Sequence, residues 1–198
     1  MSLYAQKLQR SPVSSASWSL RDLAGRFTEL SSARARASLT LAFELVREAQ
    51  LNQEPVGWVT SAESSFYPPD AAQSGADLAS LVVVRLASPE SIPRAGEKLL
   101  RSGGFGLVVL DLGRADIPMP LQSRLTGLAH RHHAALLCLT EKESRNYSLG
   151  SLVSLRGHAK RRRDSHNRFA CALQVLKDKR RGPTWSHEEF YSGPAGLC

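Results

Sequence analysis

The residues between Gly25 and Gln50, GRFTELSSARARASLTLAFELVREAQ, have the arrangement in which a phosphate-binding loop normally lies: a strand, a turn and an amphipathic helix. Such a loop follows the pattern GxxxxGK[ST]. Its glycines let backbone N–H groups surround the phosphates, its lysine reaches the outer phosphates, and its hydroxyl binds magnesium. The corresponding positions here are occupied by Ser32 (first glycine), Ala37 (second glycine), Ser38 (lysine) and Leu39 (hydroxyl). Because Leu39 cannot ligate magnesium, we expect a packed structural turn and no tightly bound ATP.

Two carboxylates stand where an ATPase with this loop would use them. Glu63 follows the predicted strand Val56–Thr60, the position of a water-activating glutamate. Asp111 ends the predicted strand Gly106–Leu110, the position of a magnesium-organising aspartate. Without the lysine and the hydroxyl neither carboxylate has a phosphate to act on, so we interpret both as vestigial and predict no catalytic residue. A residual ATPase that uses them is the alternative.

The strongest electrostatic feature is a basic segment, GHAKRRRDSHNR, between the predicted strands Leu149–Arg156 and Phe169–Lys177. We interpret it as the basic turn of a hairpin, with a second basic cluster at the end of the second strand. Arginine and lysine side chains that contact phosphates give affinity for nucleic acid without reading its sequence. DNA is therefore a candidate ligand, and a solvated hairpin is the alternative. The residues expected at the phosphates are Arg156, Lys160, Arg161, Arg162, Arg163, Arg168, Lys179, Arg180 and Arg181.

Histidine and cysteine patterns give little support for a metal site. His130 and His133 lie near a predicted helix end with no cysteine or carboxylate to complete a set, and a helix C-terminus that favours protonated imidazole explains them better. Cys138, Cys171 and Cys198 are odd in number, far apart and without a CxxC pair, and Cys138 lies in an apolar run typical of a buried free thiol. We expect no metal and no other cofactor.

Composition limits the class of protein. The chain has 198 residues, 42% of them hydrophobic, which is enough for one α/β domain with a real core. A net charge of +8 favours an anionic partner, nucleic acid before an anionic membrane surface. No apolar run has the length of a membrane span, and the N-terminus shows no secretory signal. We expect a cytoplasmic, nucleoid-associated protein that does not bind membranes.

Strand and helix patterns alternate through most of the chain. The helix that follows Ser31 and Ser32, its candidate caps, repeats apolar residues four apart at Leu41, Leu45 and Ala49. Apolar runs predict buried strands, and near-continuous runs such as GLVVLDLG are typical of parallel strands covered on both faces. The further predicted strands are Leu81–Leu86, Gly106–Gly113 and Ala134–Leu139, and the further predicted helices are one from Ser88 to about Gly103 and one over Leu121–His130.

The alternation predicts an α/β fold with a mainly parallel sheet, helices on both faces and a C-terminal antiparallel hairpin. Pro68 and Pro69 are expected to keep the loop after the second strand out of a helix. We divide the chain into a flexible N-terminal arm (1–19), the core (20–181) and a Pro/Gly-rich tail (182–198) that contains one acidic-aromatic stretch, SHEEFY.

At this point the chain resembles the RecA family over about residues 20 to 197. GRFTEL with the following loop and helix is similar to the opening of the RecA core, and VGWVTSAES is similar to its second core strand with an Ala-Glu pair. The stretch from Gly75 to Gly113 resembles the approach to the magnesium-organising aspartate, and Leu121–Arg131 and Val175–Trp185 resemble the next helix and the late basic strand. The resemblance implies a RecA-like core.

Several segments and side chains that RecA uses for its activities are missing from this sequence. The lysine, the glycines and the hydroxyl of the phosphate loop are absent, few residues separate Asp111 from Leu121 where RecA has its first DNA-binding loop, and Thr140–Ser148 is a short remnant of the second. Only 24 residues precede Gly25, too few for the segment by which RecA docks onto its neighbour. ATP hydrolysis, strand exchange and self-polymerisation are therefore not expected.

A short RecA relative of this kind looks most like the ImuA family of the bacterial mutagenesis cassette. That resemblance implies a non-catalytic role in SOS-induced translesion synthesis. It also implies a partner, an ImuB-type inactive relative of Y-family polymerases, and through it an error-prone replicative-type polymerase. The alternative within the fold is SulA, which blocks cell division by binding FtsZ.

The RecA resemblance also implies a partner site. In RecA filaments the N-terminal segment of a neighbour lies along an edge strand and the adjacent helix, here the predicted strand Leu81–Leu86 and the helix after Ser88. An edge strand offers unpaired N–H and C=O groups, and apolar side chains beside it supply pockets. The alternative is that LVVVRL is simply a core strand. The residues expected to contact the partner are Leu81, Val82, Val83, Val84, Arg85, Leu86, Ala95 and Leu99.

Overall fold

The computed structural model describes residues 17–33, 37–62, 64, 66–165, 168–183 and 185–192. The strands in this part of the chain are β1 (Phe27–Ser32), β2 (Val56–Ser61), β3 (Leu81–Leu86), β4 (Leu107–Gly113), β5 (Ala135–Glu141), β6 (Leu155–Ser165), β7 (Arg168–Asp178) and β8 (Ser186–Ser192). The helices are α1 (Leu20–Leu23), α2 (Ala37–Leu51), α3 (Pro68–Gln73), α4 (Ile92–Ser102) and α5 (Met119–His132), with 3-10 turns η1 (Leu78–Ser80) and η2 (Pro89–Ser91).

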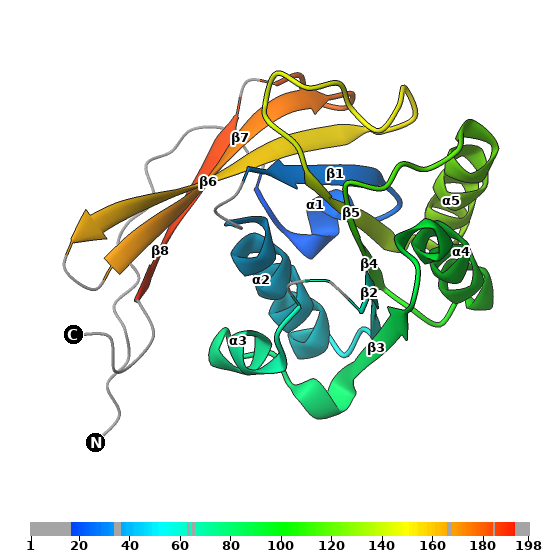
Figure 1. Cartoon of the computed structure of the whole chain (residues 1–198), viewed down its shortest axis with the longest axis horizontal. Coiled ribbons are helices and arrows are strands. Elements are labelled where there is room, and N and C mark those ends of the chain that lie inside the picture. The colour runs from blue at the N-terminus through cyan, green and yellow to red at the C-terminus, as the bar shows by residue number, and fades with distance from the viewer. Residues whose placement is uncertain are drawn as a thin grey trace.

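One sheet of eight strands organises the described residues, in the order β3-β2-β4-β5-β1-β6-β7-β8. Neighbouring strands are parallel from β3 to β6 and antiparallel from β6 to β8. Figure 1 shows the antiparallel strands projecting away from the helix-covered part of the sheet. The predicted fold class, a mainly parallel α/β sheet with a C-terminal antiparallel hairpin, is confirmed, and it is consistent with a RecA-like core.

Helices cover both faces of the parallel strands (Figure 1). On one face the predicted apolar positions of α2, Leu41, Leu45 and Ala49, are completely buried in a cluster that includes Trp58 of β2. On the other face α4 and α5 pack over β4 and β5, where Cys138 is a completely buried free thiol as expected. In the described residues no helix is long and apolar enough to cross a membrane.

The connection from β5 to β6 contains no helix. Residues 142–154 carry the chain past β1, because β5 and β6 lie on opposite sides of that strand. Leu149 and Val153 of this connection are buried in the same core cluster as α5. Gln122 of α5 donates hydrogen bonds of 2.8 Å to the backbone carbonyls of both Ile117 and Leu149 and so ties the connection to the helix.

Three local predictions near helix starts are wrong. Pro68 and Pro69 do not exclude a helix: they open α3, because proline is well tolerated in the first turn, where its missing N–H has no helical partner anyway. Ser88 does not cap the following helix, since η2 intervenes and its hydroxyl donates to the Glu90 carboxylate. Ser31 belongs to β1, and its hydroxyl donates to the carbonyl of Gly157.

Predictions at the C-terminal end need larger correction. The strands of the hairpin are Leu155–Ser165 and Arg168–Asp178, so most of the segment interpreted as a basic turn, residues 157–165, belongs to β6. Arginines are accommodated in this strand because Arg162 pairs with Glu188 on β8 and Arg161 packs on the ring of Phe169. Within the predicted tail, the SHEEFY stretch forms β8, which pairs with β7 over Gln174–Arg168.

Candidate functional sites

The frame of a phosphate site lies at the carboxyl end of β1. Ser32 ends the strand and Ser38 lies in the first turn of α2, and their hydroxyl oxygens are 2.8 Å apart, within hydrogen-bonding distance. Both residues are buried, and Ala37 between the loop and the helix is completely buried. Leu39 packs against the core beneath α2. The two hydroxyls therefore satisfy each other at positions that in a working loop meet phosphate.

A cavity of about 160 Å³ remains beside this pair, below the range of about 300–1,000 Å³ typical of ligand pockets. Its lining comes from the ends of β1, β4 and β5 and from the start of α2: Ser32, Ala33, Ser38, Leu39, Asp111, Gly113, Leu139, Thr140 and Glu141. Among the residues that the structure describes, this lining includes two carboxylates and no lysine or arginine. Residues 34–36 of the loop lie outside the described part of the chain. The described lining is thus poorly matched to a triphosphate.

The two predicted vestigial carboxylates have different outcomes. Asp111 lies within β4 near its carboxyl end, is buried, and accepts a hydrogen bond of 3.1 Å from the Thr60 hydroxyl of β2. It reaches the cavity wall, as a residue at the end of a parallel strand should. Glu63 lies outside the described residues. Of the two predicted vestigial carboxylates, Asp111 therefore lies at the cavity beside Ser32 and Ser38.

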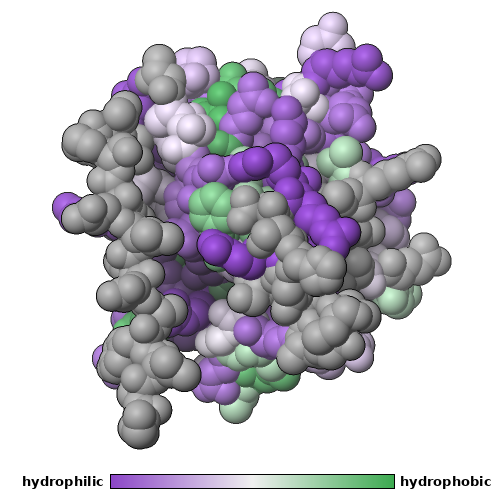
Figure 2. Space-filling view, turned by 90° about the vertical axis from the view of Figure 1, so that its left-hand side faces the viewer, coloured by the Kyte–Doolittle hydropathy of each residue, from purple (hydrophilic) through white to green (hydrophobic). Residues whose placement is uncertain are grey.

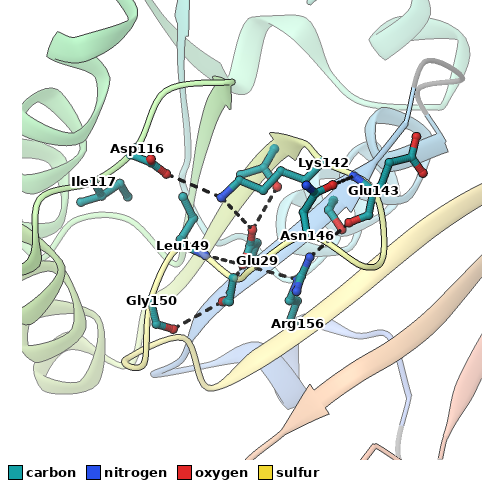
Figure 3. Close-up of polar contacts among 12 residues, drawn as sticks. Glu29, Asp116, Ile117, Lys142, Glu143, Asn146, Leu149, Gly150 and Arg156 are labelled. Atoms are coloured by element: carbon teal, nitrogen blue, oxygen red, sulfur yellow. Dashed lines mark hydrogen bonds and ion pairs between the residues drawn. The ribbon is translucent and has the colours of Figure 1, made fainter.

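The opposite face of β1 carries a buried carboxylate that sequence reasoning missed. Glu29 is completely buried, and Figure 3 shows the polar groups around it. Its oxygens accept hydrogen bonds from the Thr140 hydroxyl (3.2 Å), the Ser148 hydroxyl (2.7 Å) and the backbone N–H of Leu149 (2.9 Å). Two of these donors belong to the β5–β6 connection, so Glu29 fastens that connection to the sheet.

Two cations complete this cluster. The ammonium of Lys142 lies 3.8 Å from Glu29 and 3.6 Å from Asp116, and Nε of Arg156 lies 3.7 Å from Glu29 (Figure 3). A buried carboxylate needs such partners, because an isolated charge in a protein interior is costly. The charged residue inside an otherwise buried strand pattern, TEL, was the signal that could have revealed it.

Arg156 is consequently misassigned as a DNA-contacting residue. It is buried, its guanidinium lies beside the Glu29 carboxylate and donates to the backbone carbonyl of Glu143, and it is paired in register with Lys177. Its neighbour His158 is also buried and lies 3.1 Å from the Ser31 hydroxyl. Burial, reinforced by the charge of Lys160, lowers the pKa of His158 below its ordinary 6.5. This end of β6 is part of the protein interior.

Farther along β6 the basic residues are exposed, and their direction alternates as in any strand. Lys160 and Arg162 lie on the face away from α2, where Arg162 forms an ion pair of 3.4 Å with Glu188 of β8. Arg161 lies on the other face, with its guanidinium 3.7 Å from the centre of the Phe169 ring. We call the exposed set Lys160, Arg161, Arg162, Arg163 and Arg168 the distal basic cluster.

The second predicted basic cluster does not join the first. Arg162 is paired with Ala170, near the start of β7, whereas Lys179, Arg180 and Arg181 follow its end. Nine residues of strand separate Ala170 from Lys179, roughly 30 Å at about 3.3 Å per residue. There Arg181 forms an ion pair of 2.9 Å with Asp22, and the Lys179 ammonium donates to the Ser151 carbonyl. These residues fasten the hairpin to the core.

Beneath them lies a buried ion pair that the sequence did not reveal. Arg26, immediately before β1, and Asp178, at the end of β7, are 2.6 Å apart and almost fully buried. Asp178 also accepts hydrogen bonds from the Trp185 indole and from the Arg180 backbone. Burial alone would raise the pKa of Asp178, but the hydrogen bonds from Arg180, Arg26 and Trp185 outweigh it and lower this pKa below its ordinary 3.8.

The strand predicted to meet a partner lies at one end of the sheet. Among the described strands, β3 pairs with β2 alone. Val82 is 47% exposed, whereas Val83 and Val84 pack against the cores on the two faces of the sheet, together with Ala95 and Leu99 of α4. The guanidinium of Arg85 lies 5.7 Å from the centre of the Phe66 ring. Leu81–Leu86 is therefore both an edge strand and part of the core.

Comparison with known proteins agrees with this arrangement. No protein-family model matches the chain. Protein RecA of Chlorobaculum parvum is 34% identical over 103 residues, 52% of this chain and 28% of the relative. Protein RecA of Chlorobaculum tepidum is 33% identical over 103 residues, 52% of this chain and 29% of the relative. That of Chlorobium chlorochromatii is 31% identical over 119 residues, 54% of this chain and 33% of the relative.

These similarities support a RecA-like relationship. The chain spans about a third or less of the length of the curated relatives it matches.

Proposed function

We propose that this RecA-like chain is a non-catalytic adaptor in SOS-induced translesion DNA synthesis. The proposal rests mainly on the contact between the Ser32 and Ser38 hydroxyls. These serines stand where a working loop has a glycine and a lysine that bind phosphate, while the strand and helix on either side remain. A protein that keeps this fold without the groups that act on phosphate is suited to binding, because fold and activity are separable. ATP hydrolysis by Asp111 and Glu63 is not part of the proposal.

The partner in this proposal is an ImuB-type inactive relative of Y-family polymerases, which in turn brings an error-prone replicative-type polymerase. The resemblance to the ImuA family motivates that choice. The edge of β3 supports a binding mode in which a partner segment adds a strand to the sheet. Val82 would contact the added segment directly, and Ala95 and Leu99 on α4 are partly buried apolar residues that pack against the same core cluster as Val84 of this strand.

DNA is the second candidate partner, through the distal basic cluster. Its residues are exposed and project from the end of the hairpin, where a duplex backbone could reach them. Figure 2 shows the side of the molecule toward which these strands project, and its described surface is mainly hydrophilic with small hydrophobic patches. Glu188 offsets part of the charge, so the cluster supports modest affinity without base readout.

Binding of the recombinant partner tests the adaptor role. Val82→Lys places a charge on the exposed edge of β3, a substitution that natural edge strands use to prevent strand addition. We expect at least a tenfold loss of affinity, measured by calorimetry. Tyr147→Lys is the matched control, because Tyr147 is 93% exposed on the β5–β6 connection, outside this edge. Equal affinity of both variants and the parent chain would place the interface elsewhere.

A co-purification from DNA-damaged cells separates the adaptor from the division inhibitor. Recovery of the Y-family relative supports the proposal, and recovery of FtsZ alone overturns it. A residual ATPase is tested by thermal unfolding in Mg-ATP, where the proposal expects no change in melting temperature.

DNA contact is tested by the salt dependence of binding. Four phosphate contacts predict that log K falls with log salt at a slope of about −3.6. Replacing Arg162 and Arg163 with alanine should make the slope less negative by up to about 1.8. Replacing Arg101 of α4, 67% exposed in its side chain and outside the hairpin, should leave it unchanged. A slope near zero for the parent chain would exclude phosphate contact.

A further inference from the structure

A set of metal-binding side chains lies between α2 and β8, away from the phosphate frame and the β3 edge. Glu44 of α2 and His187 and Glu189 of β8 each direct one donor atom into the same space, and these atoms lie within 4.8 Å of one another. All three residues are partly buried. His187 and Glu189 belong to the stretch SHEEFY, which has no part in the proposed function.

Strand geometry explains why these side chains meet. Alternate residues of a strand face the same side, so His187, Glu189 and Tyr191 all point toward α2. Glu188 points to the opposite face, where it pairs with Arg162. Pairing of β8 with β7 then fixes the height of these groups beside the middle of α2, at Glu44.

The arrangement without an ion has two unfavourable features. Nε2 of His187 is buried without a hydrogen-bond partner, 3.7 Å from a Glu44 oxygen, and the side chain is only 11% exposed. A buried polar atom without a partner costs free energy. Two carboxylates, Glu44 and Glu189, also lie close together, where like charges repel. A divalent cation would remove both problems at once.

A fourth group orients the site. The phenol of Tyr191 donates a hydrogen bond of 3.2 Å to a Glu44 oxygen. Hydrogen bonds of this kind hold metal-binding carboxylates in place in known metal sites.

We propose that Glu44, His187 and Glu189 bind one divalent transition-metal ion that links the last strand to α2. One imidazole nitrogen and two carboxylate oxygens suit Zn²⁺ among the common ions. With bonds of about 2.0–2.2 Å in a tetrahedral site, two ligand atoms on one zinc lie roughly 3.3–3.6 Å apart. His187 Nε2 and Glu44 already lie 3.7 Å apart, and side-chain rotations would bring all three donor atoms, now within 4.8 Å of one another, around the ion. Water supplies the remaining position, and the ion clamps β8 in its pairing with β7.

Calorimetric titration of the full chain with Zn²⁺, after chelator treatment, tests the site. We expect one equivalent bound, and a melting temperature raised by roughly 5–10 °C at about a hundredfold excess over Kd. His187→Gln and Glu189→Gln should each weaken binding at least tenfold. Glu188→Gln, one residue away on the other face, should bind like the parent chain. Mg²⁺ should give no comparable shift, because it prefers oxygen ligands in octahedral geometry.

Other outcomes would overturn the proposal. Surface histidines could also bind zinc. A variant with His130, His132 and His133 changed to Gln should therefore still bind one equivalent of Zn²⁺. Loss of this binding would place the zinc site at the end of α5. If the parent chain binds no Zn²⁺ and its melting temperature does not change with the metal, the three side chains do not form a metal site. If His187→Gln melts near the parental temperature in chelator, its loss of Zn²⁺ binding is not caused by misfolding. Glu189→Gln, measured in the same way, tests the second ligand independently.

Discussion

The two faces of β1 carry polar residues with very different surroundings. Toward α2, Ser32 has one short contact with Ser38, beside a cavity of about 160 Å³. On the opposite face Glu29 is completely buried, accepts three hydrogen bonds and has two cations within 4 Å. In a nucleotide site the end of this strand would lead into the phosphate-binding loop. Here the charged residue of the strand, Glu29, binds the β5–β6 connection on the opposite face. The charged contacts of β1 therefore join the sheet to the β5–β6 connection.

Removing the Glu29 carboxylate should have the largest effect. Glu29→Ala leaves Arg156 and Lys142 without their buried counter-charge, and breaking a buried pair from one side costs about 3–5 kcal/mol. Denaturant unfolding measures this loss. Glu29→Gln keeps the shape and the acceptor oxygen, so it should cost less and reports on the charge itself. A loss under about 1 kcal/mol for both variants would remove the contrast between the faces.

Asp178→Asn tests the buried pair at the other end of β1 and should rank second. Arg26 would lose its counter-charge but keep hydrogen bonds to the carbonyl and hydroxyl of Ser154, so we expect about 2–3 kcal/mol. The substitution should also change acid sensitivity. Because the folded pKa of Asp178 lies below its ordinary 3.8, its contribution is complete above that value and is lost as the pH falls through the folded pKa.

Unfolding curves from neutral pH to about pH 2 measure that second effect. The parent chain should lose more stability than Asp178→Asn below about pH 4. Parallel curves for the two proteins would mean that other carboxylates dominate acid unfolding.

Ser38→Ala should have a small effect, about 1 kcal/mol, since it removes one neutral hydrogen bond and leaves Ser32 beside a cavity. Ser32→Ala should cost a similar amount, and the double variant should cost no more than either single one if the two hydroxyls serve only each other. A cost as large as that of Glu29→Ala would mean that this face is as tightly constrained as the other.

Mg-ATP should have the smallest effect of all. We expect the melting temperature of the parent chain to change by less than about 1 °C at millimolar nucleotide, because the described cavity lacks the cations that hold a triphosphate. A shift of several degrees would show that the phosphate frame still binds its ligand.

Several features could be predicted because their signals are local. The apolar repeat of Leu41, Leu45 and Ala49 needs only helical periodicity to indicate the buried face of α2. The continuous apolar run of β4 indicates a strand covered on both faces, and LVVVRL forms a strand over its whole predicted length. Substitution of the lysine and hydroxyl of a phosphate loop by Ser38 and Leu39 is likewise readable from spacing alone.

Other features could not be predicted because their causes lie elsewhere in the chain. Arg161 and Arg162 have the composition of a basic turn, yet they are in a strand because Phe169 and Glu188 receive their side chains. Arg156 has the same local sequence character but is buried, since Glu29 lies beside it on the neighbouring strand.

By itself, then, the sequence determined the strand–helix frame around Ser32, the alternation that makes a mainly parallel sheet, and the replacement of the phosphate-loop lysine and hydroxyl by Ser38 and Leu39. These depend on residue type and short-range periodicity. Only the tertiary structure decided which charges are buried and that Glu44 meets His187. Such decisions depend on strand order and register, which bring together groups far apart in the chain. Long-range pairing is set by the whole core, and no local pattern encodes it.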